Sequence, residues 1–112
     1  MTTREIINEG KNYIKYNDLK GLESIYYHIT ASTNDYLING VYVFRNLYIY
    51  ACQYGTRETL IWFIELFYEV FSDIERIALR QLFIYGKYTM RRNRCISVGW
   101  YNDSIISLVK IA

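Results

Sequence analysis

A tyrosine followed by a glycine ends an apolar, aromatic stretch twice in this chain, at residues 54–55 and again at residues 85–86. The second pair comes 31 residues after the first, and polar residues follow both. A period of this length is the size of one helical hairpin and indicates a helix-pair repeat. The pairs therefore predict an all-α fold, built as a short array of antiparallel helical hairpins or as an irregular helical bundle.

Capping residues and helical spacing predict six to seven helices. Thr2 and Glu5 form a capping box before a helix that runs to about residue 16. Asn17 or Asp18 caps a second helix, which continues to about residue 29. Residues 30–40 are rich in small polar types, and most of them are predicted to form a loop, with a short helical start at Asp35.

Residues 41–54 contain many β-forming types, so a strand competes with a helix there. Their length exceeds that of a usual strand, and Arg45, Asn46 and Gln53 can share one polar side, which favours the helix. Gly55 is expected to end it in the left-handed conformation. Thr56 then caps a helix over residues 57–71 that is apolar on nearly all sides, which predicts the central position in the fold.

The last third of the chain contains further capping signals. Residues 72–75 read Ser-Asp-Ile-Glu, a second capping box, and open a helix that is expected to end at Gly86. Residues 95–98 are a candidate sixth helix, which Gly99 would break. Asn102 or Asp103 is expected to cap a last short helix, which must dock on its neighbours to persist.

The chain has 112 residues, which predicts a single helical domain over 1–112. Thirteen of them are tyrosines and none is proline. Drift in an AT-rich genome and selection for binding explain this composition equally well. A tyrosine pairs an apolar ring with a hydroxyl that needs a partner, so many should lie at the rim of the core or at a contact surface. Six aromatic residues are predicted as core or contact anchors: Tyr26, Tyr27, Trp62, Phe63, Tyr68 and Trp100.

Charge is distributed unevenly along the chain. Residues 1–75 hold six Lys or Arg and ten Asp or Glu, a net charge of −4, whereas residues 76–112 hold seven and one, a net charge of +6. Such polarity can steer an acidic ligand or dock one subunit head to tail on another. The predicted contact surface for a partner or a nucleic acid is basic, with one tyrosine: Arg76, Arg80, Lys87, Tyr88, Arg91, Arg92 and Arg94.

Residues 87–94, called the basic connector below, admit three interpretations. The first is a solvated surface between helices. The second is docking on the acidic half of another copy. The third is nucleic-acid binding, in which the cations neutralise phosphates and Tyr88 stacks on a base. The acidic residues available to the second interpretation are Glu58, Glu65, Glu69, Asp73 and Glu75.

The sequence predicts no catalytic residue, no metal site, no cofactor and no small-molecule substrate. His28 is the only histidine, and a Ser-His pair with Ser24 is disfavoured against a structural role. Glu65 and Glu69 fit a solvated stripe better than a catalytic carboxylate pair. Cys52 and Cys95 lack metal-ligand spacing and are expected to be reduced thiols.

The N-terminus has no secretory signal and no apolar run reaches the length of a membrane span. The expected location is therefore the cytoplasm, with entry into the nucleus by diffusion as an alternative and no contact with membrane.

Residues 47–65, LYIYACQYGTRETLIWFIE, resemble an ankyrin repeat, with an apolar first helix, a glycine turn and a longer second helix. Residues 17–27 are similar to the second half of another such unit. The chain departs from the family in three ways. The interval from Asn17 to Gly55 is 38 residues, against about 33 in the family, Arg91 and Arg92 fall where the family has core residues, and its threonine-proline start is absent.

The resemblance covers roughly residues 12–86. Large DNA viruses often encode eroded ankyrin-like units in Tyr-, Ile- and Asn-rich chains, so it implies a virion or host-modulating protein, in the host cytoplasm or the virion. Together these features predict a non-enzymatic protein–protein interaction or scaffold module that self-associates, as a dimer. The alternative is a small nucleic-acid-binding protein that uses the basic connector.

Overall fold

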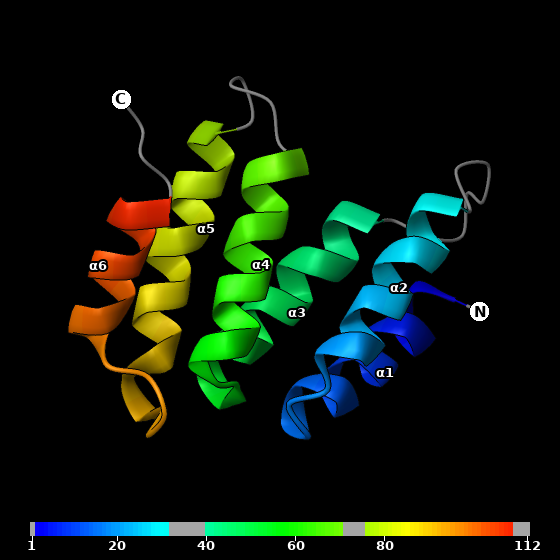
Figure 1. The fold of residues 1–112 in the computed structure, drawn as a ribbon, viewed down its shortest axis with the longest axis horizontal. Helices are drawn as coiled ribbons and strands as arrows, with labels where there is room; N and C mark the ends of the chain where they lie inside the picture. The colour runs from blue at the N-terminus through cyan, green and yellow to red at the C-terminus, as the bar shows by residue number, and fades with distance from the viewer. Residues whose placement is uncertain (1, 32–39, 71–75, 109–112) are drawn as a thin grey trace.

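The computed structural model describes residues 2–31, 40–70 and 76–108, and these residues form an all-α fold (Figure 1). The prediction of an all-α fold is confirmed, with no strand in the described ranges. They contain six α-helices and one turn of 3-10 helix: α1 (Thr3–Lys15), α2 (Leu19–Ala31), α3 (Gly40–Tyr54), α4 (Arg57–Val70), α5 (Arg76–Thr89), η2 (Met90–Arg92) and α6 (Val98–Leu108).

The helices form three successive hairpins in two layers. In the first layer α3 contacts both α1 and α5, while α2 packs on α1, α4 packs on α3, and α6 packs on α4. The first helices of the hairpins begin at residues 3, 40 and 76, at intervals of 37 and 36 residues. The structural unit is therefore longer than the 31 residues between the two Tyr-Gly pairs.

The two Tyr-Gly pairs are not equivalent, which corrects the prediction of a shared turn. Tyr54 is the last residue of α3, but Tyr85 and Gly86 lie inside α5, which continues to Thr89. Gly86 is buried, and a Cβ there would lie 2.9 Å from Cys52 Sγ. This glycine lets α5 approach α3 closely and does not end a helix.

Gly55 also has a role other than the one predicted. No described glycine has a positive φ, and Asn17, with φ of 54°, is the non-glycine residue in the left-handed region. Gly55 instead packs tightly against the end of α3, where its N–H donates to the Ala51 carbonyl at 2.7 Å. An added Cβ would lie 2.7 Å from that same oxygen, so the requirement is steric.

Side-chain caps begin the first two helices. The Thr2 hydroxyl accepts from the Glu5 N–H at 3.2 Å, which confirms the predicted N-cap. Between the two candidates for the second cap, the structure selects Asp18, whose carboxylate accepts from the Gly21 N–H at 3.0 Å.

The turns of the first two hairpins are tied together. Asn17 does not cap α2; its side-chain oxygen accepts from the Thr56 hydroxyl at 2.8 Å. Thr56 also caps α4 as predicted, through a contact of 3.4 Å between its hydroxyl oxygen and the Thr59 N–H.

Ser97 begins the last helix, which corrects three predictions. Its hydroxyl accepts from the Trp100 N–H at 3.1 Å, so the predicted caps Asn102 and Asp103 lie inside α6. Gly99 is also helical, and an added Cβ would meet nothing within 4 Å. Residues 95–97 are not helical and connect η2 to α6.

The predicted loop is shorter at both ends than residues 30–40, because α2 extends to Ala31 and α3 begins at Gly40. The rest of that loop with the helical start at Asp35, and the capping box at 72–75, lie outside the described residues.

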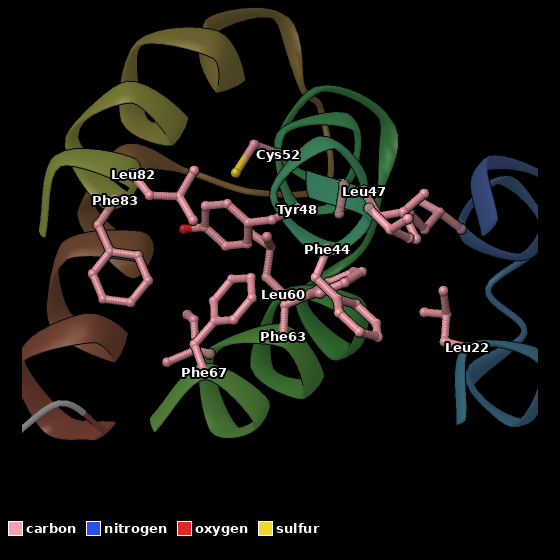
Figure 2. Packing of buried hydrophobic residues seen from close by; sticks show 14 of the residues in the cluster. Leu22, Phe44, Leu47, Tyr48, Cys52, Leu60, Phe63, Phe67, Leu82 and Phe83 are labelled. Carbon is pink, nitrogen blue, oxygen red and sulfur yellow. The ribbon is translucent and has the colours of Figure 1, made fainter. Parts of the chain in front are cut away.

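The central helix is α3, and the prediction of α4 was wrong. Helix α3 contacts α1, α4, α5 and η2, because its apolar positions spread over two sides. Tyr48 lies near the middle of α3 and is fully buried. Its ring packs against Phe63, Phe67 and Phe83 at centroid distances of 6.2, 5.5 and 5.9 Å (Figure 2). Helix α4 is wrapped on two sides, by α3 and α6.

A buried tyrosine pair joins α3 to α6. The hydroxyl of Tyr101 donates to the Phe83 carbonyl at 2.8 Å and is also hydrogen-bonded to the Tyr48 hydroxyl. Because the single Tyr101 proton goes to Phe83, Tyr48 is the donor within the pair. Burial raises the pKa of both phenols, so they stay protonated and neutral in the core.

Candidate functional site

The second layer contains a groove between α2 and α4, called the α2–α4 groove below. It encloses about 260 Å³. Tyr26 and Trp62 are half-buried in its walls, and Tyr27 is exposed. The structure therefore brings together three of the six predicted aromatic anchors. The described residues that line the groove are Glu23, Tyr26, Tyr27, Trp62, Glu65, Leu66 and Glu69.

The walls of this groove are continuous with the aromatic core. The rings of Tyr26 and Tyr27 lie 5.7 Å apart, Phe44 lies 6.2 Å from Tyr26, and Trp62 lies 6.5 Å from Phe44. Trp62 in turn meets Phe63 edge-on at 5.0 Å. Because these rings are packed against one another, the groove is fixed before any partner arrives.

The chemistry of the groove suits a cation. Glu23, Glu65 and Glu69 are exposed, and no hydrogen bond or ion pair joins them to another residue in the described part of the chain. Carboxylates attract guanidinium and ammonium groups by charge, and aromatic faces attract them through the ring quadrupole. An arginine or lysine side chain in this groove would meet both.

The remaining predicted anchors lie elsewhere. Phe63 is fully buried and belongs to the core, and Tyr68 exposes 41% of its surface on α4. Trp100 is half-buried on α6, beneath the guanidinium of Arg57 at 5.1 Å. The six aromatic residues thus divide between core, groove and separate surface positions.

The predicted basic residues form two groups. Arg80 and Lys87 are exposed on α5 and line a second, mostly apolar groove of about 430 Å³ with Ile84 and with Asn102 and Ile105 of α6. The side chain of Arg76 lies outside the described residues.

The other group is the basic connector, which is anchored to α3. Met90 is buried, and the Asn93 amide donates to the Cys52 and Gly55 carbonyls at 2.9 and 3.0 Å. The exposed guanidinium of Arg91 lies 5.7 Å from the centroid of the Tyr88 ring. Arg92 and Arg94 are exposed on this held segment.

Of the other acidic residues considered for docking, Glu58 is exposed in the first turn of α4. Its pKa is lowered, first by hydrogen bonding to the helix backbone and then by Thr56. Asp73 and Glu75 lie outside the described residues.

Ser24 and His28 line one small cavity with Glu9, of about 250 Å³. The Ser24 hydroxyl donates to the Lys20 carbonyl at 3.0 Å, and Glu9 accepts from Tyr13 at 2.6 Å. These bonds direct the groups to partners other than His28.

Cys52 is buried, and burial raises its pKa to about 12, so this thiol is neutral at physiological pH. Cys95 is an exposed free thiol. Among the described residues, no three His, Cys, Asp or Glu side chains converge on a position for a metal ion.

Charge is divided between the two layers, which the charge of each half of the chain did not predict. Helices α1, α3 and α5 carry seven Lys or Arg and two Asp or Glu, a net charge of +5. Helices α2, α4 and α6 carry two Lys or Arg and five Asp or Glu, a net charge of −3. Alternate helices belong to alternate layers, so a sum over each half of the chain mixes the two.

No family model, curated protein or solved structure matches this chain. No helix within the described ranges is long and apolar enough to cross a membrane.

Proposed function

We propose that this chain is a non-enzymatic protein–protein interaction module that self-associates, and that its α2–α4 groove receives cationic side chains of the partner. The observation that carries the proposal is the groove itself, which three exposed carboxylates and three aromatic rings line together. A small site of this composition selects arginine or lysine over neutral and acidic side chains.

The partner segment that fits best is the basic connector of a second copy. Arg91, Arg92 and Arg94 are exposed there and are held by the anchored Asn93. Arginine also suits a site that places a carboxylate beside an aromatic ring, because its planar guanidinium can stack on the ring and hydrogen-bond to the carboxylate at once.

In its own chain the connector lies far from two of the three carboxylates of the groove. Asn93 fixes it beside Gly55, at the start of α4, while Glu65 and Glu69 lie ten and fourteen residues further along the chain. At the rise of an α-helix this is about 15–20 Å. Self-association would therefore join two different surfaces, the connector of one copy and the groove of another. The contact is either made twice, which closes a dimer, or repeated with further copies.

The resemblance to ankyrin-type hairpins supports the same class of function. A place in a virion or in host modulation, and a cytoplasmic location, are predictions from that resemblance.

Multi-angle light scattering across micromolar concentrations tests self-association. A mass above 13.5 kDa that rises with concentration is expected at low salt. The mass should fall toward that of the monomer as salt rises above ~0.5 M, since exposed charge pairs are screened. A clean monomer at all concentrations would contradict the proposal.

Charge reversal locates the contact. Glu65→Lys should give a monomer, whereas Asp103→Lys makes the same charge change on α6, outside the groove, and should leave the mass unchanged. Adding Arg92→Glu to Glu65→Arg should restore association if these two residues meet. Equal loss in Glu65→Lys and Asp103→Lys would show a general charge effect instead.

The second candidate is a small nucleic-acid-binding protein that uses the basic connector. Its support is the exposed Tyr88 ring beside the Arg91 guanidinium, a pair that can stack on a base and neutralise a phosphate. Fluorescence anisotropy with duplex and single-stranded DNA tests it. Binding that is unchanged by Arg91→Glu with Arg92→Glu would contradict a role of the connector.

A further inference from the structure

The first layer, away from the α2–α4 groove, carries a second concave surface of interest. It encloses about 460 Å³ and crosses α1, α3 and α5, and is called the three-helix groove below. Lys11 and Arg45 supply its cations, and Tyr42, Tyr50 and Tyr85 supply its rings. None of the described residues that line it is acidic.

The absence of acid extends beyond the lining. Helices α3 and α5 contain no Asp or Glu in their described ranges. The two in α1 lie on the side toward α2, since Glu9 shares a cavity with Ser24 and Glu5 precedes Glu9 by one turn.

On α1, cations mark the side of the groove. Arg4, Lys11 and Lys15 follow one another at intervals of seven and four residues, which places them in one row along the helix. Lys11 is in that row and lines the groove, with its Nζ 5.5 Å from the centroid of the Tyr50 ring. A polyanion lying across the groove would therefore meet a row of positive charge at its α1 edge.

Exposed rings distinguish this surface from a plain basic patch. Tyr42 and Tyr85 expose 55% and 59% of their surfaces, from α3 and α5. Rings held at the surface on two neighbouring helices can stack on unpaired bases while the cations contact the backbone phosphates. Gln53 adds an exposed amide to the lining, close to the Cys52 carbonyl that holds the basic connector.

We infer that the three-helix groove binds single-stranded nucleic acid, with Lys11 and Arg45 on phosphates and Tyr42 and Tyr85 on bases. The exposed rings favour this ligand over an acidic protein segment, because the carboxylates of such a segment would need only the cations of the groove. They also favour a single strand over a duplex, in which the base faces are already stacked. This inference does not depend on self-association, which involves the α2–α4 groove and the connector.

The test is fluorescence anisotropy with a labelled thymidine oligonucleotide of ~12 nucleotides, titrated from ~50 to 200 mM salt. Saturable binding that weakens with salt is expected. Arg45→Ala should weaken it at least fivefold and reduce the salt slope by about 0.7, the value for one phosphate contact on a single strand. Tyr85→Ala should weaken it roughly five- to 100-fold with the salt slope unchanged, since stacking releases no counterion.

Matched controls come from elsewhere on the surface. Lys20→Ala removes an exposed cation of α2, and Tyr16→Ala removes a ring that is 75% exposed between α1 and α2. Both should bind like the wild type. Circular dichroism and light scattering on each variant show whether folding and association are intact.

Three results would overturn the inference. The first is no saturable binding at ~50 mM salt. The second is equal weakening by Arg45→Ala and Lys20→Ala, or a silent Tyr85→Ala, because binding would then follow net charge alone. The third is loss of binding only on substitution of Arg91 and Arg92, which would place the site at the connector. Poly-glutamate that binds as tightly as the oligonucleotide would identify an acidic protein surface as the ligand instead.

Discussion

Gly86→Ala should destabilise this protein, although alanine normally stabilises a helix. Replacing a glycine in a helix interior by alanine gains about 0.5–1 kcal/mol, because the unfolded chain loses freedom and the helix backbone is shielded. At Gly86 the added methyl would lie 2.9 Å from Cys52 Sγ and 3.0 Å from both the Tyr101 hydroxyl and Tyr48 Cε1.

None of these three neighbours can move aside at low cost. Tyr48 and Cys52 are fully buried and Tyr101 is 1% exposed. The Tyr101 hydroxyl is also committed to Tyr48 and to the Phe83 carbonyl. Overpacking in a core costs about 1–3 kcal/mol, which exceeds the gain in helix propensity. The expected net loss of unfolding free energy is therefore about 1–2 kcal/mol.

Gly99→Ala is the matched control, because an added Cβ there meets nothing within 4 Å. It lies in the first turn of α6 and is exposed, so a gain of up to about 0.5 kcal/mol is expected. Urea unfolding followed by far-UV circular dichroism measures both, with the m-value expected to stay constant. If Gly86→Ala were as stable as the wild type, or if both substitutions shifted stability in the same direction, the packing role of Gly86 would be refuted.

Four further outcomes concern residues in and around the core at α3. Tyr101→Phe leaves the Tyr48 hydroxyl without its buried acceptor and should cost about 1–3 kcal/mol in urea unfolding. Asn93→Ala frees two carbonyls at the end of α3 and should cost about 1–2 kcal/mol, with protease cleavage in the basic connector as a second measure. At pH 8, Ellman's reagent should react with the exposed Cys95 thiol in seconds and with the buried Cys52 thiol only after unfolding. Because burial raises the Cys52 pKa to about 12, the folded state keeps the thiol proton that the unfolded state loses near pH 9. The contribution of Cys52 to the free energy of unfolding should therefore be fully present below pH 9 and be lost between about pH 9 and 12. Urea unfolding at a series of pH values measures it.

Local signals in the sequence predicted the helices well. The cap at Thr2, the cap at Thr56 and the helical spacing of residues 41–54 are decided within a few residues, and each is found in the structure. Glycine was the main source of error. A glycine that ends a helix and one that makes room for a neighbour look alike in one sequence, because the crowding atoms at Gly86 come from residues 34 positions before it and 15 after it, Cys52 and Tyr101.

The candidate sites were predicted only in part for the same reason. Composition identified Trp62 and Tyr26 as contact residues, but their meeting with Glu65 and Glu69 depends on how α2 packs beside α4. The three-helix groove was not predicted. Six of its described lining residues lie on α3, but Lys11 of α1 and Leu82 and Tyr85 of α5 join them only through the packing of three helices that begin 37 and 36 residues apart.

The α2–α4 groove and the three-helix groove lie on opposite layers, so one copy can use both grooves at once. Self-association would leave the three-helix groove open, and an oligomer would present several such grooves to one strand. A strand of ~30 nucleotides should then bind at least tenfold more tightly than one of ~6, by effective concentration. Glu65→Lys should abolish that advantage and leave the short strand unaffected or bound slightly more tightly, because the substitution adds positive charge. Asp103→Lys adds the same charge and should keep the advantage, which separates loss of association from a change in net charge. If Glu65→Lys weakened binding of the short strand as well, the α2–α4 groove would itself contact the nucleic acid, and the assignment of one ligand to each layer would be wrong.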